Sequence, residues 1–425
     1  MTASKDRFIL GMLPVISILA EIVKSFFEES KVMALKNYLC LALVLYLTIR
    51  YFKYCIKVNL SIYLLGLYLL VCLIFQNGNL ETFNTWIAVF ESKWLFPLGF
   101  ILVFNLDQLK PINKGVLLTG LLFAIFLLIF LAFNIGENQY GGVGGFTVGS
   151  FKFTRIYTGS YVIMCLPLLF LTVSGKWMKK LLPVLGLIIF IILVMSTRRT
   201  SILLVIIGMA VFALSFLKLL PSYLPKVIVF LCLVAVCFPL YKDILLDQLN
   251  KRSHVFIEQK GFDLESETRY EETLAVWNER LRHYDLKVIF FGNHLFDSIG
   301  NYDQGVHRER PLHLDINVIL HGSGLIGLVI FIFFFAEVLV LFLKIGFQPE
   351  TTTDRIIWST FLTFYLAMLF LIFSGGMTTV THNMIGSIIL GATLGLMSSQ
   401  RKLIDNQNNP KILKPFSFDW PKRAT

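Results

Sequence analysis

Long apolar runs recur along this sequence and limit what the chain can fold into. A helix needs about 20 apolar residues to cross the ~30 Å hydrocarbon core of a membrane. Such runs begin near residue 8 and continue to about residue 399, and 56% of the 425 residues are hydrophobic. Only 15% are charged, whereas soluble domains carry about 25%. The sequence therefore predicts an all-α polytopic membrane protein.

The lengths of these runs predict about twelve transmembrane helices. The expected ranges are 8–27, 33–52, 59–76, 83–104, 113–134, 156–174, 181–197, 200–220, 226–242, 322–345, 356–375 and 379–399. By this division, residues 1–242 hold helices one to nine and residues 313–399 hold helices ten to twelve. Residues 243–312 form a large hydrophilic loop with short helices, and residues 400–425 form a tail.

Lysine and arginine are distributed unevenly over the connections between the runs. If the N-terminus is cytoplasmic, most basic residues fall on cytoplasmic connections and in the tail, as the positive-inside rule requires. Both termini are then cytoplasmic and residues 243–312 face outward. The rule accounts for most of the net charge of +11. Because the basic residues are not gathered in one domain, no nucleic-acid partner is expected.

Two basic clusters break this rule on the predicted outer side. Arg198 and Arg199 join the seventh and eighth runs, and Lys152 and Arg155 close a glycine-rich connection before the sixth. Such side chains can extend to lipid headgroups. Alternatively, guanidinium groups at a helix end can bind phosphate or pyrophosphate through paired hydrogen bonds. The residues alone leave both explanations open.

His313 and His321 lie just before the tenth run, in "PLHLDINVILHGSGLIG". An imidazole there can act as a general base near neutral pH, although a structural role is more common. No third ligand has a recognisable spacing, and all six cysteines lie in or beside apolar runs. We therefore expect neither a metal site nor a cofactor. The glycines of "HGSGLIG" lead into an apolar helix rather than follow a strand, so they are expected to permit close helix packing instead of dinucleotide binding.

Glu91 and Lys93 are charged residues inside the fourth predicted span. Charges within a membrane are costly and are functional by default. At positions i and i+2 they do not face each other on a helix. Their role stays open between structure and a transport or proton pathway.

These features together resemble the O-antigen ligase family of membrane glycosyltransferases. The most specific motif of that family is a histidine, usually followed by Asn, Ser or Gln, then nine residues and Gly-x-x-Gly. Here His313 is followed by Leu314, nine residues, and Gly324 to Gly327 without a gap. Leu314 departs from the polar residue of the motif.

Two arginine motifs add to the resemblance. Arg199 to Leu203 is similar to an Arg-x-x-x-Leu pattern of the family, and Arg198 fits it after a shift of one residue. Arg269, in "SETRYEETLAVWNERL", matches an arginine that precedes an amphipathic helix in the external loop. The likeness covers the topology of nearly the whole chain but rests on three short motifs.

The resemblance implies metal-independent, inverting transfer of a glycan from undecaprenyl pyrophosphate to an acceptor sugar. The reaction takes place on the periplasmic face of the bacterial inner membrane, and lipid A–core is the acceptor of the ligases. The alternative is a polymerase of the same superfamily, which extends one lipid-linked glycan with another. A lipid or glycan transporter is a more distant alternative, because the sequence lacks the internal repeats typical of transporters. The expected catalytic residues are His313, Arg199 and Arg198, and the expected substrate-binding residues are Arg269, Arg155, Lys152 and His321.

Overall fold

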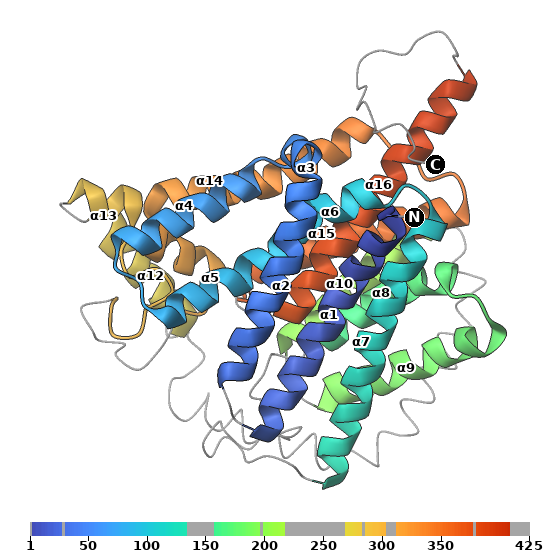
Figure 1. Cartoon of the computed structure of the whole chain (residues 1–425), viewed down its shortest axis with the longest axis horizontal. Helices are drawn as coiled ribbons and strands as arrows, with labels where there is room; N and C mark the ends of the chain where they lie inside the picture. Colours follow the sequence, from blue (N-terminus) through green and yellow to red (C-terminus); the bar gives the residue numbers. More distant parts are fainter. Residues whose placement is uncertain are drawn as a thin grey trace.

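The computed structural model describes eight segments of the chain. They are residues 2–27, 30–133, 157–195, 199–216, 268–282, 285–302, 312–376 and 380–408. These segments form helices, and no strand occurs among them (Figure 1). The helices are α1 (Thr2–Phe27), α2 (Ser30–Arg50), α3 (Phe52–Val58), α4 (Ser61–Phe75), α5 (Leu80–Lys93), α6 (Leu95–Leu102), α7 (Leu106–Phe133), α8 (Tyr157–Thr172), α9 (Lys176–Met195), α10 (Arg199–Ser215), α12 (Thr268–Leu281), α13 (Leu286–Phe291), α14 (Asp315–Ile345), α15 (Thr352–Ile372) and α16 (Val380–Asn408).

Every predicted span but one coincides with helix, and the exception, 226–242, lies outside the described residues. Six of the described helical stretches are long and apolar enough to cross a membrane. The number is seven if α3 and α4, which meet at 100°, form one span. The chain is therefore a helical membrane protein, as the apolar runs predict, whereas twelve crossings stay a prediction.

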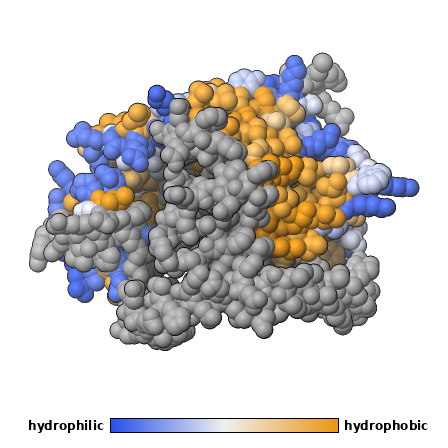
Figure 2. Space-filling model, turned by 90° about the horizontal axis from the view of Figure 1, so that it is seen from below, coloured by the Kyte–Doolittle hydropathy of each residue, from blue (hydrophilic) through white to orange (hydrophobic). Residues whose placement is uncertain are grey.

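The outer surface agrees with this class of protein. Figure 2 shows a broad apolar area on the described part of one face, with hydrophilic residues toward both sides. On α4, the exposed side chains include Leu64, Leu67, Val71 and Ile74, which recur at helical spacing. An apolar stripe of this kind suits contact with lipid tails.

Local sequence explains where several helices begin and end. Asn79 caps α5, because its side chain accepts a hydrogen bond from Thr82 N at 2.9 Å. Thr351 and Asp354 form a reciprocal capping box at the start of α15. Gly346 ends α14 in the left-handed conformation, at φ 56°. These are the side chains that satisfy or terminate helix ends most readily.

α16 is the central helix of the bundle, and its most apolar 18-residue window is completely buried. It packs closely along α6 because glycines on both helices let the backbones approach. A Cβ atom on Gly99 would lie 2.5 Å from the carbonyl oxygen of Ile388, and one on Gly395 would lie 2.5 Å from that of Phe100. Larger residues would force the two helices apart.

α14 is interrupted at Gly324, whose φ of 63° and ψ of −164° are not helical. Residues 325–345 alone rise about 31 Å, enough to cross the hydrocarbon core. Residues 315–323 form a separate half-helix, beside which α12 and α13 lie at the left of Figure 1. A Cβ atom on Gly322 would lie 2.7 Å from Leu295 Cα. The prediction that these glycines permit close packing is confirmed.

Candidate functional site

His313 lies just before α14 and contacts Glu272 of α12. Its Nδ1 atom is 3.2 Å from Glu272 Oε2. The other carboxylate oxygen, Oε1, accepts hydrogen bonds from the backbone N–H of His313 at 2.8 Å and of Leu314 at 3.4 Å. Glu272 thus holds the backbone of the two residues that lead into α14, and the imidazole, at the same time. A neutral ring that donates from Nδ1 leaves Nε2 as a proton acceptor.

The surroundings of the two side chains differ in a way that suits proton transfer. The Glu272 side chain is 1% exposed, whereas that of His313 is 30% exposed. Burial raises the pKa of Glu272, but the hydrogen bonds from the ring and backbone of His313 and from Leu314 outweigh it, so this pKa lies below the usual glutamate value. The carboxylate is therefore ionised near neutral pH, where it orients the imidazole and stabilises its protonated form.

His321 has a different partner, Arg280 of α12. Arg280 Nη2 lies 2.6 Å from His321 Nδ1, and both residues are buried. An arginine can only donate, so Nδ1 of His321 must accept. Burial lowers the pKa of Arg280, which still remains protonated. His321 was predicted to bind substrate; the structure gives it a partner inside the protein, and the substrate contact stays a prediction.

The two pairs show that α12 runs alongside the half-helix in a fixed register. In both Glu272–His313 and Arg280–His321 the partners are separated by 41 residues in the sequence. Between these pairs, Asn317 Nδ2 donates to Thr273 Oγ1 at 3.0 Å. α12 thus supplies one acidic, one neutral polar and one basic contact along the half-helix.

Buried hydrogen bonds join the start of α14 to α16 and α5. Asp315 Oδ1 accepts from Gly376 N at 2.9 Å, and Asn383 Nδ2 donates to Gly376 O at 2.8 Å. Lys93 Nζ in turn donates to Asn383 Oδ1 at 2.8 Å. These contacts fix the polar end of the half-helix against the centre of the bundle.

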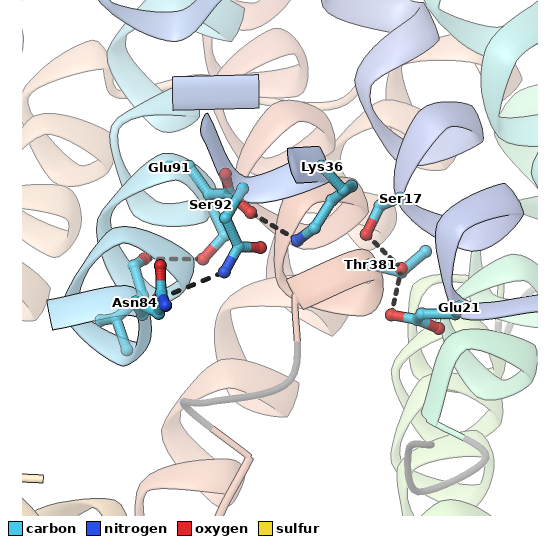
Figure 3. Close-up of polar contacts among 9 residues, drawn as sticks. Ser17, Glu21, Lys36, Asn84, Glu91, Ser92 and Thr381 are labelled. Atoms are coloured by element: carbon cyan, nitrogen blue, oxygen red, sulfur yellow. Dashed lines mark hydrogen bonds and ion pairs between the residues drawn. The ribbon is translucent and has the colours of Figure 1, made fainter. Parts of the chain in front are cut away.

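Glu91 faces a different neighbour from Lys93. Its Oε1 atom lies 2.8 Å from Lys36 Nζ on α2, and the two side chains are 0% and 2% exposed (Figure 3). Such a fully buried ion pair is costly to break, because removal of one partner leaves an unpaired charge. The expectation that Glu91 and Lys93 do not face each other is confirmed.

A second polar contact in Figure 3 ties α1 to the start of α16. Thr381 Oγ1 lies 2.7 Å from both Ser17 Oγ and Glu21 Oε1. The next residue, His382, packs edge-on against the rings of Tyr157 and Tyr161 on α8, with centroids 5.2 and 5.1 Å apart. Polar and aromatic contacts therefore converge on the first turn of α16.

The start of α10 reaches the same end of the bundle. Ser160 Oγ on α8 donates to Ser201 O in the first turn of α10, at 2.8 Å. From α8, the contacts continue to α14 in two steps. Tyr157 of α8 packs against His382, and His382 lies beside Gly376, whose N–H donates to Asp315 at the start of α14. Arg199 is the first residue of α10. The helix that carries Arg199 and the segment that carries His313 are therefore linked through α8 and the start of α16.

The remaining predicted residues are described incompletely. Lys152, Arg155 and Arg198 lie outside the described residues, and of Arg199 and Arg269 only the helical backbone is described. Arg269 is in the first turn of α12, three residues before Glu272. Within the described ranges, no group of three His, Cys, Asp or Glu side chains is arranged to hold a metal ion.

Sequence reasoning missed Glu272, Asn383 and His382. Glu272 stands in the amphipathic stretch already singled out for Arg269, and a carboxylate one turn after that arginine was a detectable candidate partner for a histidine. Asn383 and His382 sit in the apolar run "VTHNM", where isolated polar residues inside a predicted span point to buried contacts.

The comparisons with known proteins identify no relative. No protein-family model matches the chain, and no curated protein matches it. A function is therefore inferred from the residues and their geometry.

Proposed function

We propose that this chain is a membrane glycosyltransferase of the O-antigen ligase type. It would move a glycan from undecaprenyl pyrophosphate to an acceptor sugar, lipid A–core, on the periplasmic face of the bacterial inner membrane. The observation that carries the proposal is the pairing of half-exposed His313 with the buried carboxylate of Glu272. A carboxylate that orients an imidazole is the arrangement expected of a general base.

In the proposed reaction an acceptor hydroxyl attacks the anomeric carbon of the lipid-linked glycan. The new C–O bond forms as the bond to pyrophosphate breaks, with inversion at that carbon. His313 Nε2 takes the hydroxyl proton, and Glu272 stabilises the resulting imidazolium. Arg199 and Arg198 are assigned to the charge that develops on pyrophosphate, because guanidinium forks match its oxygens. Arg269, Lys152 and Arg155 are assigned to the binding of the same anionic donor.

The convergence of helix starts supports a site on one side of the membrane. The first turns of α8, α10 and α16 and the segment before α14 are linked by contacts at one end of the bundle. α1 begins and α16 ends toward the opposite end, at the upper right of Figure 1. This arrangement supports placing the site on one side of the membrane and the start of α1 and the end of α16 on the other; we assign the site to the periplasmic side and the termini to the cytoplasmic side.

The test is a transfer assay with purified full-length protein, an undecaprenyl-pyrophosphate glycan and no added metal. Lipid A–core and a second lipid-linked glycan are supplied as separate acceptors. We expect transfer to lipid A–core, and transfer only to the lipid-linked glycan would identify a polymerase instead. His313→Ala should lower the rate by about 10²–10⁴-fold, the usual contribution of a positioned base.

His313→Gln is the matched variant, because its amide can still donate to Glu272 but cannot take a proton at neutral pH. We expect it to fold and to be as inactive as His313→Ala. A folded His313→Gln protein that transfers at the wild-type rate would contradict the assignment. Absence of glycan transfer to either acceptor by the wild-type protein would remove the proposed function as a whole.

A further inference from the structure

The break in α14 exposes backbone carbonyls that the helix itself cannot bond. A helix that ends before Gly324 has no internal donors for its last four carbonyl groups. Within a membrane protein each such group needs another partner, because an unsatisfied carbonyl costs several kcal/mol in hydrocarbon. Three consecutive carbonyls accept hydrogen bonds of 2.9 Å from outside the helix: His321 O from Asn293 N, Gly322 O from Gln76 Nε2, and Ser323 O from Tyr68 OH.

Two of the three donors are the side chains of Tyr68, on α4, and of Gln76, the residue that follows α4. Both also contact the segment that contains α13. Tyr68 OH lies 3.2 Å from the carbonyl oxygen of Phe290. Gln76 Oε1 accepts a hydrogen bond from Leu295 N at 2.8 Å. Gln76 therefore uses both ends of its amide, one toward the half-helix and one toward the segment that packs on it. Tyr68 and Gln76 are eight residues apart, about two turns, so they bind the break along one side of α4.

The half-helix is consequently held at both of its ends. At its start, the carboxylate of Glu272 accepts from the backbone of His313 and Leu314. At its end, the hydrogen-bond ladder that would fix it to residues 325–345 is interrupted at Gly324. Only contacts from outside the helix can then set the direction of residues 315–323 relative to the rest of α14. Tyr68 and Gln76 supply two of those contacts.

We propose that Tyr68 and Gln76 are positioning residues, which hold the half-helix 315–323 in the direction that places His313 for proton transfer. The inference rests on the proposed function, because it assigns the base role to His313. Neither side chain is expected to touch the substrate. A displacement of the reacting groups by about 1 Å can cost roughly 10²-fold in rate, so loss of two anchoring bonds should be visible in turnover.

The test uses full-length protein and the variants Tyr68→Phe, Gln76→Leu and the double variant. Tyr365→Phe is the matched control, since Tyr365 OH also donates to a carbonyl of α14, that of Phe335 at 3.2 Å, but beyond the break. Two quantities are measured: hydrogen exchange of the amides in residues 315–323, and kcat and KM of glycan transfer. Gln76→Glu is a partial variant, because it keeps an acceptor for Leu295 N and loses the donor to Gly322 O.

We expect the double variant to exchange faster in residues 315–323 and to lose about 10- to 100-fold in kcat with KM close to that of the wild type. The single variants and Gln76→Glu should lie between, and Tyr365→Phe should change neither quantity. Unchanged exchange in residues 315–323, or unchanged kcat, in the double variant overturns the proposal. If the wild-type protein transfers no glycan, the proposed function fails instead, and if His313→Ala retains full transfer, the base assignment of His313 fails. In either case exchange alone then decides whether Tyr68 and Gln76 hold the half-helix.

Discussion

His313 lies just before the half-helix and His321 within it, and both contact α12, yet their partners carry opposite charges. His313 is half-exposed and lies beside the carboxylate of Glu272. His321 is buried and accepts a hydrogen bond from the guanidinium of Arg280. A carboxylate favours a proton on the imidazole, whereas a guanidinium opposes a second positive charge beside it. The surroundings of His313 thus suit proton transfer, whereas those of His321 favour a neutral imidazole.

The difference arises from the spacing of charges on α12 rather than from the histidines themselves. The same sequence separation of 41 residues joins both pairs, so the two helices run in a constant register. The residue of α12 that faces the imidazole therefore decides its chemistry. An acid, as at Glu272, stabilises a protonated ring, whereas a base, as at Arg280, does not. Exposure adds to this contrast, because only the His313 ring retains contact with solvent, where an acceptor hydroxyl can approach.

Of the substitutions that test this contrast, Glu272→Gln is expected to have the largest effect on turnover. The amide can still accept from the backbone N–H groups of His313 and Leu314, but it carries no charge to stabilise an imidazolium. We expect kcat of glycan transfer to fall at least about tenfold, as loss of the orienting carboxylate does in related catalytic arrangements. Steady-state kinetics of the purified protein provide the measurement.

Glu271→Gln is the control for that change, because it removes an acid from the adjacent position of the same helix. It should leave kcat within about twofold of the wild type, because the carboxylate that contacts the ring and backbone of His313 is that of Glu272. Wild-type turnover in a folded Glu272→Gln protein would show that the carboxylate serves only the helix start.

The helices of this fold are largely readable from the sequence, because the length of an apolar run is a local property. The same holds for Gly322 and Gly324, whose spacing in an apolar run indicates a close approach of backbones. The 100° turn between α3 and α4 is different. It occurs around Asn59, whose side chain donates to Phe334 O at 3.3 Å, so it depends on a helix that lies 275 residues away in the sequence.

The site was only partly predictable for a related physical reason. A motif of fixed spacing indicated His313, but its partner Glu272 depends on how α12 folds back beside α14. Lys93 and Asn383 illustrate the same limit, because their hydrogen bond joins residues separated by 290 positions. A single sequence carries no information on such pairings beyond the unusual cost of each buried polar group.

An intermediate effect is expected from His321→Ala, which tests the other half of the comparison. The change leaves the buried Arg280 guanidinium without its hydrogen-bond acceptor, and its Nε already has no partner among the described residues. We expect the free energy of unfolding to fall by about 3 kcal/mol, and KM for transfer to rise only if His321 also contacts the substrate. Chemical unfolding in detergent and the transfer assay measure the two quantities. A raised KM with unchanged stability would instead favour the predicted contact between His321 and substrate.

The smallest effect concerns the pH dependence of the Glu272 contribution to stability. The pKa of Glu272 is lower in the folded chain than the usual glutamate value, which is about 4.3 in an unfolded chain. A lowered folded-state pKa means that the ionised group stabilises the fold when the pH lies above the unfolded-state pKa. This stabilisation is lost as the pH falls through the folded-state pKa.

Hydrogen bonds to a charged group contribute roughly 1.5–3 kcal/mol. The unfolding free energy of the wild type should therefore exceed that of Glu272→Gln at about pH 5, and the difference should shrink as the pH falls below about 4. A difference that grows below about pH 4 would mean that burial, rather than the hydrogen bonds of His313 and Leu314, dominates the environment of Glu272. The contrast with the arginine-paired His321 would then lose its electrostatic basis.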